Sequence, residues 1–139
     1  MYYSKKIKDS SQAANLMRGH LEDLDHEELW ALFLTSANTL IGAEMLTKGT
    51  LSATLIDSRT VVKRALMNNA ASVIILHNHP SGEACPSLND IRQTASIRSA
   101  CNLLDISLLD HIILAGKRYF SFAEDGSFEF DPNDPPFIK

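Results

Sequence analysis

The chain has 139 residues and a formal net charge of −4, with ordinary hydrophobic and charged fractions. This length predicts one α/β domain over residues 1–139. Its longest basic cluster is the short "SKKIKD", which argues against direct nucleic-acid binding. No apolar run is long enough to cross a membrane, and "MYYSKKIKDSSQ" lacks the apolar core of a secretory signal. We therefore expect a cytoplasmic protein whose two cysteines are reduced.

The elements predicted in chain order are a helix at 9–21, strands at 29–35, 40–49 and 51–56, a helix at 57–70, a strand at 71–77, a helix at 88–103, and strands at 106–116 and 118–126. Ser10 or Ser11 would cap the first helix, and Asp57 or Ser58 the second. The uncharged, β-branched "ASVIILH" is typical of a strand covered on both faces. The order predicts a mixed sheet flanked by helices, α/β (α+β), rather than a regular parallel series. A helical element in about residues 1–22 opens the domain, and a proline-rich tail in about residues 124–139 ends it.

The stretch "ILHNHPSGEACPSLND" carries the chemistry of the chain. Side chains alternate along a strand, so His77 and His79 point the same way if the backbone stays extended. Pro80 favours that, because the residue before proline is pushed toward extended geometry. Ser87 can cap the next helix, and Asp90 occupies its first turn, at the spacing of a capping box.

Two histidines and one aspartate can supply the three N/O ligands of a catalytic zinc site. The alternatives are ordinary. A lone histidine is usually exposed or packed in the core, and an aspartate in the first turn of a helix is usually only a cap. The HxH pair alone is a weak signal, whereas HxHP after an apolar strand followed by SxxD at a helix start is far more specific.

The same stretch fits the JAMM (MPN-plus) metalloprotease pattern, and "KRALMNNAASVIILHNHPSG" and "LLDHIILAGKRYFSFAEDG" resemble the RadC family over nearly the whole chain. The resemblance implies a JAB/MPN-type fold, related to the cytidine-deaminase-like architecture. It implies one Zn²⁺ held by His77, His79 and Asp90. It also implies that Ser87 helps to hold the tetrahedral intermediate and that Glu44 is the general acid/base.

The residues around Glu44 leave its role open. It is the only charge in "LIGAEML", and strand alternation gives it apolar neighbours, so burial would raise its pKa as a proton shuttle needs. An exposed carboxylate on the outer face of an edge strand fits equally well, and only the resemblance favours catalysis. Glu83, in the loop between the ligands, is the local rival.

The predicted function is a zinc-dependent metallopeptidase or isopeptidase-like hydrolase acting on a peptide or isopeptide substrate. The alternative is a DNA-repair-associated accessory or binding protein that keeps the fold without peptidase activity. The chain resembles the short family form without a helix-hairpin-helix-like region. The sequence leaves the roles of Cys85 and His111 undecided, although a structural or neutral role for Cys85 is favoured. His20 and His26 have no partners at ligand spacing and are expected at the surface.

Overall fold

The computed structural model describes residues 5–49 and 57–129. Its elements are α1 Ser10–Leu21, β1 Glu28–Leu34, β2 Leu40–Lys48, α2 Ser58–Met67, β3 Ser72–Asn78, α3 Leu88–Leu103, β4 Ser107–Ala115, β5 Arg118–Ser121 and the short 3-10 helix η1 Ser127–Glu129. The strand predicted at 51–56 and most of the proline-rich tail lie outside the described residues. Within the described residues, no helix combines the length and apolar character needed to cross a membrane.

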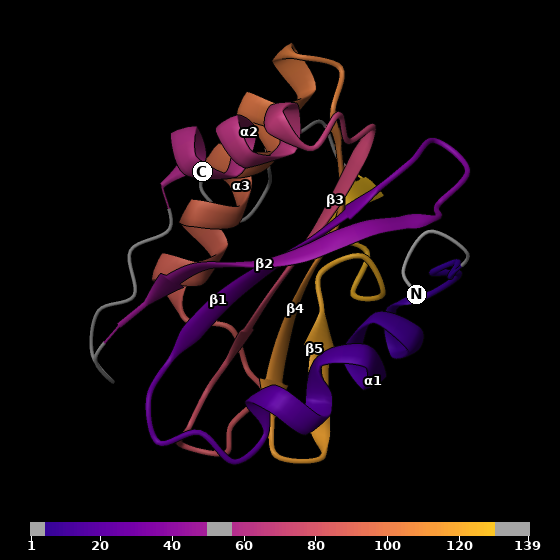
Figure 1. Ribbon diagram of the computed structural model, residues 1–139. Helices are drawn as coiled ribbons and strands as arrows, with labels where there is room; N and C mark the ends of the chain where they lie inside the picture. Colours follow the sequence, from indigo (N-terminus) through magenta and orange to yellow (C-terminus); the bar gives the residue numbers. More distant parts are fainter. Residues whose placement is uncertain (1–4, 50–56, 130–139) are drawn as a thin grey trace.

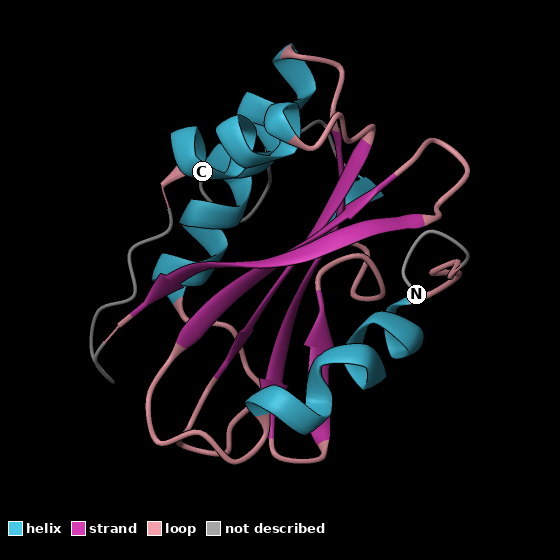
Figure 2. Ribbon diagram, viewed as in Figure 1, coloured by secondary structure: helices cyan, strands magenta, loops and turns pink. Residues whose placement is uncertain are grey.

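The five strands form one mixed sheet in the order β2-β1-β3-β4-β5. Among the strands of the described residues, only the β3–β4 pair is parallel; β1 pairs antiparallel with both β2 and β3, and β5 with β4. Helix α1 lies against one face, and α2 and α3 cover the other (Figures 1 and 2). This arrangement confirms the predicted mixed sheet flanked by helices.

The central position of β3 follows from its sequence. Every residue of this strand is buried, because α1 packs on one face of the sheet and α2 and α3 on the other. The alternating side chains of "SVIILHN" therefore enter two cores: Ile74 and Leu76 join the α1 core, and Val73 and Ile75 join the core under α2 and α3. The strand is thus held rigidly up to its carboxyl end, where the two histidines lie.

The helix caps were predicted with mixed success. Asp57 caps α2, as one of the two alternatives predicted. At α1 the prediction of Ser10 or Ser11 was wrong, because Asp9 has extended backbone and its carboxylate accepts a hydrogen bond from the N–H of Gln12 at 2.9 Å. The hydroxyl of Ser10 donates instead to Asp110, and so ties α1 to β4.

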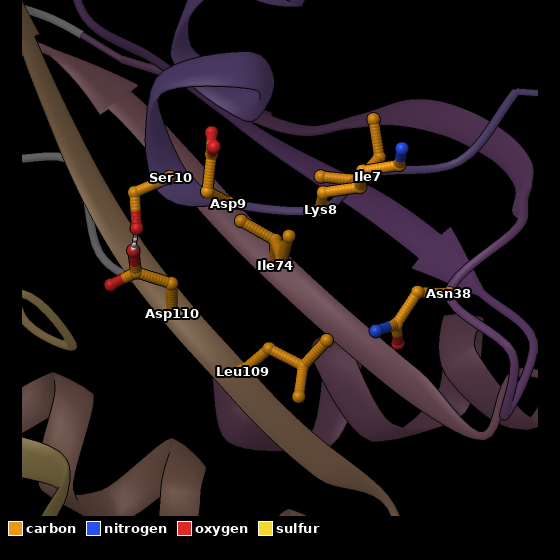
Figure 3. A pocket seen from close by; sticks show the side chains of 8 residues that line it. All are labelled: Ile7, Lys8, Asp9, Ser10, Asn38, Ile74, Leu109 and Asp110. Atoms are coloured by element: carbon orange, nitrogen blue, oxygen red, sulfur yellow. Dashed lines mark hydrogen bonds between the residues drawn. The ribbon is translucent and has the colours of Figure 1, made fainter.

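A cavity of about 200 Å³ opens beside this link (Figure 3). It lies on the α1 face and is lined by Ile7, Lys8, Asp9, Ser10, Asn38, Ile74, Leu109 and Asp110. The Asp110 carboxylate accepts hydrogen bonds from the hydroxyls of Ser10 and Ser121 and from the backbone N–H groups of His111 and Ala123. Asp110 therefore anchors α1, β4 and β5 to one another, which is a structural role.

Candidate metal centre

His77 and His79 meet at the carboxyl end of β3. The N–H of His79 donates to the carbonyl of Leu114 at 2.8 Å, which continues the β3–β4 pairing past Asn78. Both rings consequently project from the same face, as strand alternation predicts. Their Nε2 atoms lie 3.0 Å apart. His77 is 2% exposed, whereas His79 is half-buried, so the pair lies at the edge of the core.

Asp90 joins the two histidines from the start of α3. Its Oδ1 lies 3.4 Å from Nε2 of His77, and its Oδ2 lies 3.2 Å from Nε2 of His79. The same residue completes a capping box with Ser87: Asp90 N–H donates to Ser87 Oγ at 3.0 Å, and Ser87 N–H donates to Asp90 Oδ2 at 2.8 Å. Asp90 can therefore be both a capping residue and a metal ligand, because the capping box directs its carboxylate toward the two imidazoles.

The charge state of Asp90 reflects these contacts. Burial alone would raise its pKa, but the hydrogen bonds with His77 and His79 and the N–H of Ser87 outweigh burial and hold the pKa of this carboxyl well below its usual range. For His79, burial lowers the pKa and the Asp90 carboxylate raises it, with a net rise. The site is therefore an anionic carboxylate facing two imidazoles.

A second carboxylate, which the sequence analysis missed, belongs to Glu27. Ligand atoms of Glu27, His77 and His79 all lie within 4.8 Å of one another, and these three residues form a group that could hold a metal ion. Leu29 pairs with His77 across β1 and β3. Glu27 is two residues earlier and therefore lies on the same face of the sheet. The sequence signal was the pair of glutamates, Glu27 and Glu28, ahead of the apolar run "LWALFL".

The structure gives Glu44 different partners. It pairs with Ala31 on the far side of β1, and its carboxylate accepts hydrogen bonds from Arg64 at 2.6 and 3.1 Å and from Asn68 at 2.8 Å. The Arg64 guanidinium lowers the pKa of Glu44. Of the two alternatives left open for Glu44, the buried carboxylate with a raised pKa was therefore wrong, because α2 supplies a cation where the sequence indicated apolar neighbours. Among the described residues, the glutamate grouped with the two histidines is Glu27 and not Glu44.

The loop between the ligands contributes its backbone. The carbonyl of Glu83 lies 2.8 Å from Nδ1 of His79. Since a carbonyl only accepts, Nδ1 carries the proton in the neutral ring and Nε2 presents a lone pair. A lone pair and an anionic carboxylate directed at one point form a donor set that fits a divalent cation. The Glu83 side chain itself is exposed, and Cys85 is exposed with its thiol directed at the carbonyl of Pro86.

The chain matches the family model of the RadC-like JAB domain over residues 7–127. It belongs to the RadC family. It is 42% identical over 124 residues to a UPF0758 protein of Flavobacterium johnsoniae, which covers 89% of this chain and 54% of that relative. It is also 46% identical over 110 residues to the UPF0758 protein YkfG of Escherichia coli, covering 79% of this chain and 70% of the relative. The chain spans about half the length of the Flavobacterium relative and of a Staphylococcus haemolyticus relative that is 40% identical. The names of these relatives state no activity.

In this RadC-family domain, a polar network supports the site from the opposite face of the sheet. The Glu28 carboxylate is buried and bonds to His20 and His26 at 2.8 Å each and to Trp30 at 2.9 Å. Burial would raise its pKa, but these hydrogen bonds outweigh burial and lower the pKa of Glu28 to about 2. His20 is exposed, as expected, but both histidines have a partner that their spacing did not reveal.

Asn78 connects this network to the site. It stands between the two histidines on β3, and its side chain points to the opposite face. Its Oδ1 accepts from the N–H of Glu28 at 2.8 Å, and its Nδ2 donates to the carbonyl of His26 at 2.8 Å. These two bonds fix the backbone on either side of Glu27 relative to β3. The position of the Glu27 carboxylate beside the imidazoles thus depends on a side chain of the histidine strand itself.

Proposed function

We propose that this RadC-family domain is a zinc-dependent hydrolase that cleaves an amide bond in a peptide or isopeptide substrate. The observation that carries the proposal is the convergence of two imidazole Nε2 atoms, 3.0 Å apart, on a carboxylate within 3.4 Å of both. A reducing compartment such as the cytoplasm suits its two free cysteines.

His77, His79 and Asp90 would hold the ion, because all three direct lone pairs or charge at one point. Three N/O protein ligands that leave one position free are typical of catalytic rather than structural zinc sites. A zinc ion in this position would lower the pKa of a water molecule to about 7 and polarise an amide carbonyl.

Glu27 has the position of a general acid/base. Its carboxylate is grouped with the two imidazoles, and the residue lies directly before β1, the strand that pairs with β3. From there it can accept a proton from the attacking water and pass it to the departing amine. We therefore assign to Glu27 the role of general acid/base that was predicted for Glu44. Glu44 instead forms an ion pair with Arg64 of α2.

Ser87 has the position of an oxyanion donor. Its Oγ accepts the N–H of Asp90, which leaves the hydroxyl hydrogen able to donate. The residue is exposed and precedes α3 directly, so a substrate carbonyl entering over the histidines can reach both this hydroxyl and the positive end of the helix. Together with Glu27, the site offers one proton shuttle and one oxyanion donor.

The test is hydrolysis of a panel of peptides and isopeptide-linked peptides by the zinc-loaded protein, with matched glutamate variants. Glu27→Gln should lower kcat by roughly 10²-fold or more, because the amide cannot accept the proton. Glu44→Gln changes the same residue type by the same amount and should leave kcat unchanged. Loss of activity in Glu44→Gln with retention in Glu27→Gln would reverse the assignment. A zinc-loaded wild type that cleaves no member of the panel would favour the accessory or binding role.

A further inference from the structure

His111, on β4, is fully buried directly behind the metal centre. Its Nε2 lies 2.8 Å from Nδ1 of His77, and its Nδ1 contacts the hydroxyl of Thr94 on α3. The Thr94 hydroxyl in turn donates to the backbone carbonyl of Asp90 at 2.6 Å. A continuous chain of hydrogen bonds therefore runs from the ring of one candidate ligand to the backbone of another.

The direction of every bond in this chain follows from its last member. The Asp90 carbonyl can only accept, so the Thr94 hydroxyl donates its single hydrogen there. Thr94 Oγ1 must then accept from His111, whose Nδ1 carries the proton. The His111 ring is fully buried and its two nitrogens contact an imidazole and a hydroxyl, so burial keeps the ring neutral and its Nε2 accepts. Nδ1 of His77 consequently donates, and Nε2 of His77 presents its lone pair to the site.

The ring of His111 has no freedom to turn away from this arrangement. It stacks on Phe122 with the ring centroids 5.0 Å apart and the planes 9° from parallel. The backbone around it is also tied, since its N–H donates to Asp110 at 2.8 Å and its carbonyl accepts the N–H of Phe122 at 3.1 Å. The acceptor that faces His77 is thus held in place by packing on one side and by hydrogen bonds on the other.

We propose that His111 is a positioning residue of the metal centre, which holds His77 in the tautomer whose Nε2 binds the ion and, through Thr94, couples that ring to the helix turn carrying Asp90. The inference rests on the proposed function, because it presumes that His77 and Asp90 are ligands. Partners that accept the second ring N–H of a ligating histidine fix its orientation and tautomer, and their loss typically weakens metal affinity about 10–100-fold.

The experiment compares zinc affinities of two His111 variants by competition with a chromophoric chelator. His111→Phe keeps an aromatic ring on Phe122 but removes the acceptor, and should bind zinc roughly 10–100-fold more weakly than the wild type. His111→Gln supplies an amide oxygen for His77 and an amide N–H for Thr94, and should stay within about threefold of the wild type. Val61→Ala, in the core under α2, controls for loss of stability alone and should leave the zinc affinity unchanged.

A second readout does not require zinc. Ring ¹⁵N shifts of His77 in the metal-free protein should report protonated Nδ1 in the wild type and in His111→Gln, and a mixture of tautomers in His111→Phe. If His111→Phe does not fold, Thr94→Val replaces it, since that change removes the acceptor for Nδ1 of His111 and should also weaken zinc binding.

The outcomes separate the two proposals. A folded wild type that binds no zinc at the histidines contradicts the proposed function. If the wild type binds zinc and His111→Phe binds it equally tightly, the inference is overturned and His111 is only a packed residue. Equal weakening in folded His111→Phe and His111→Gln would also overturn it, because ring shape rather than the acceptor would then be responsible.

Discussion

Replacing Asn78 tests how strongly the side chain at the end of β3 stabilises the backbone around Glu27. Asn78→Ala leaves the N–H of Glu28 and the carbonyl of His26 without the partners they have at 2.8 Å. An orphaned buried polar group costs about 1–3 kcal/mol. The hydrogen bond to Glu28 is buried, so its loss carries the whole of this cost, whereas water can reach the half-buried His26 carbonyl and reduce the cost there. We therefore expect a loss of about 2–4 kcal/mol in the free energy of unfolding.

The assay is urea unfolding followed by circular dichroism and by the fluorescence of Trp30, whose indole N–H bonds to Glu28. For a chain of this size the loss corresponds to a fall in Tm of roughly 6–15 °C. Asn102→Ala, at an exposed position on α3, is the matched control and should change stability by no more than about 0.5 kcal/mol. An Asn78→Ala variant within about 1 kcal/mol of the wild type would refute the reasoning, because the two bonds would then contribute nothing that water cannot replace.

Three further predictions concern charge and accessibility. Hydrogen bonds lower the pKa of Glu28 to about 2. The wild type should therefore be more stable than Glu28→Gln above about pH 5, and this difference in the free energy of unfolding should shrink as the pH falls toward 2. A difference of the same size at pH 5 and at pH 2 would contradict this. Arg64→Ala should cost only about 0–1 kcal/mol in urea unfolding, since the ion pair with Glu44 is partly exposed, and a loss above about 2 kcal/mol would contradict that. Cys85 should react at once with a thiol reagent under native conditions, whereas Cys101, which is buried with its pKa raised to about 11 by that burial, should react only on unfolding; two equally fast thiols would be inconsistent with the fold.

The parts of the site that lie close together in the sequence could be read from it. Strand alternation and the proline after the second histidine were enough to predict that His77 and His79 face the same way. The SxxD spacing predicted the capping box of Ser87 and Asp90, and the structure confirms it. These features depend on backbone geometry over at most a few residues, which a sequence pattern encodes directly.

The parts that depend on strand pairing could not be read in the same way. Glu27 reaches the histidines only because β1 pairs antiparallel with β3 in the register that sets Leu29 beside His77. His111 reaches His77 only because β4 runs parallel to β3, with His111 beside Ile75. Neither register follows from the composition of a single strand, since a shift of one residue would turn each side chain to the other face.

The environment of Glu44 also depends on a contact that is distant in the sequence. Its local pattern correctly placed it in a strand, but the pattern carried no information about which helix would cover that strand. Arg64 and Asn68 come from α2 and convert an expected apolar environment into an ion pair. The sign of a pKa shift depends on such partners, so it could not be deduced from the strand alone.

The most direct test of the metal centre is anomalous diffraction at the zinc edge from crystals grown with zinc. We expect one peak per chain between Nε2 of His77 and Nε2 of His79, at about 2.0–2.1 Å from both nitrogens. Asp90 should supply the third ligand, and the Glu27 carboxylate should lie beyond coordination distance. A peak elsewhere, or one coordinated by Glu27 in place of Asp90, would contradict the assignment of His77, His79 and Asp90 as the ligands.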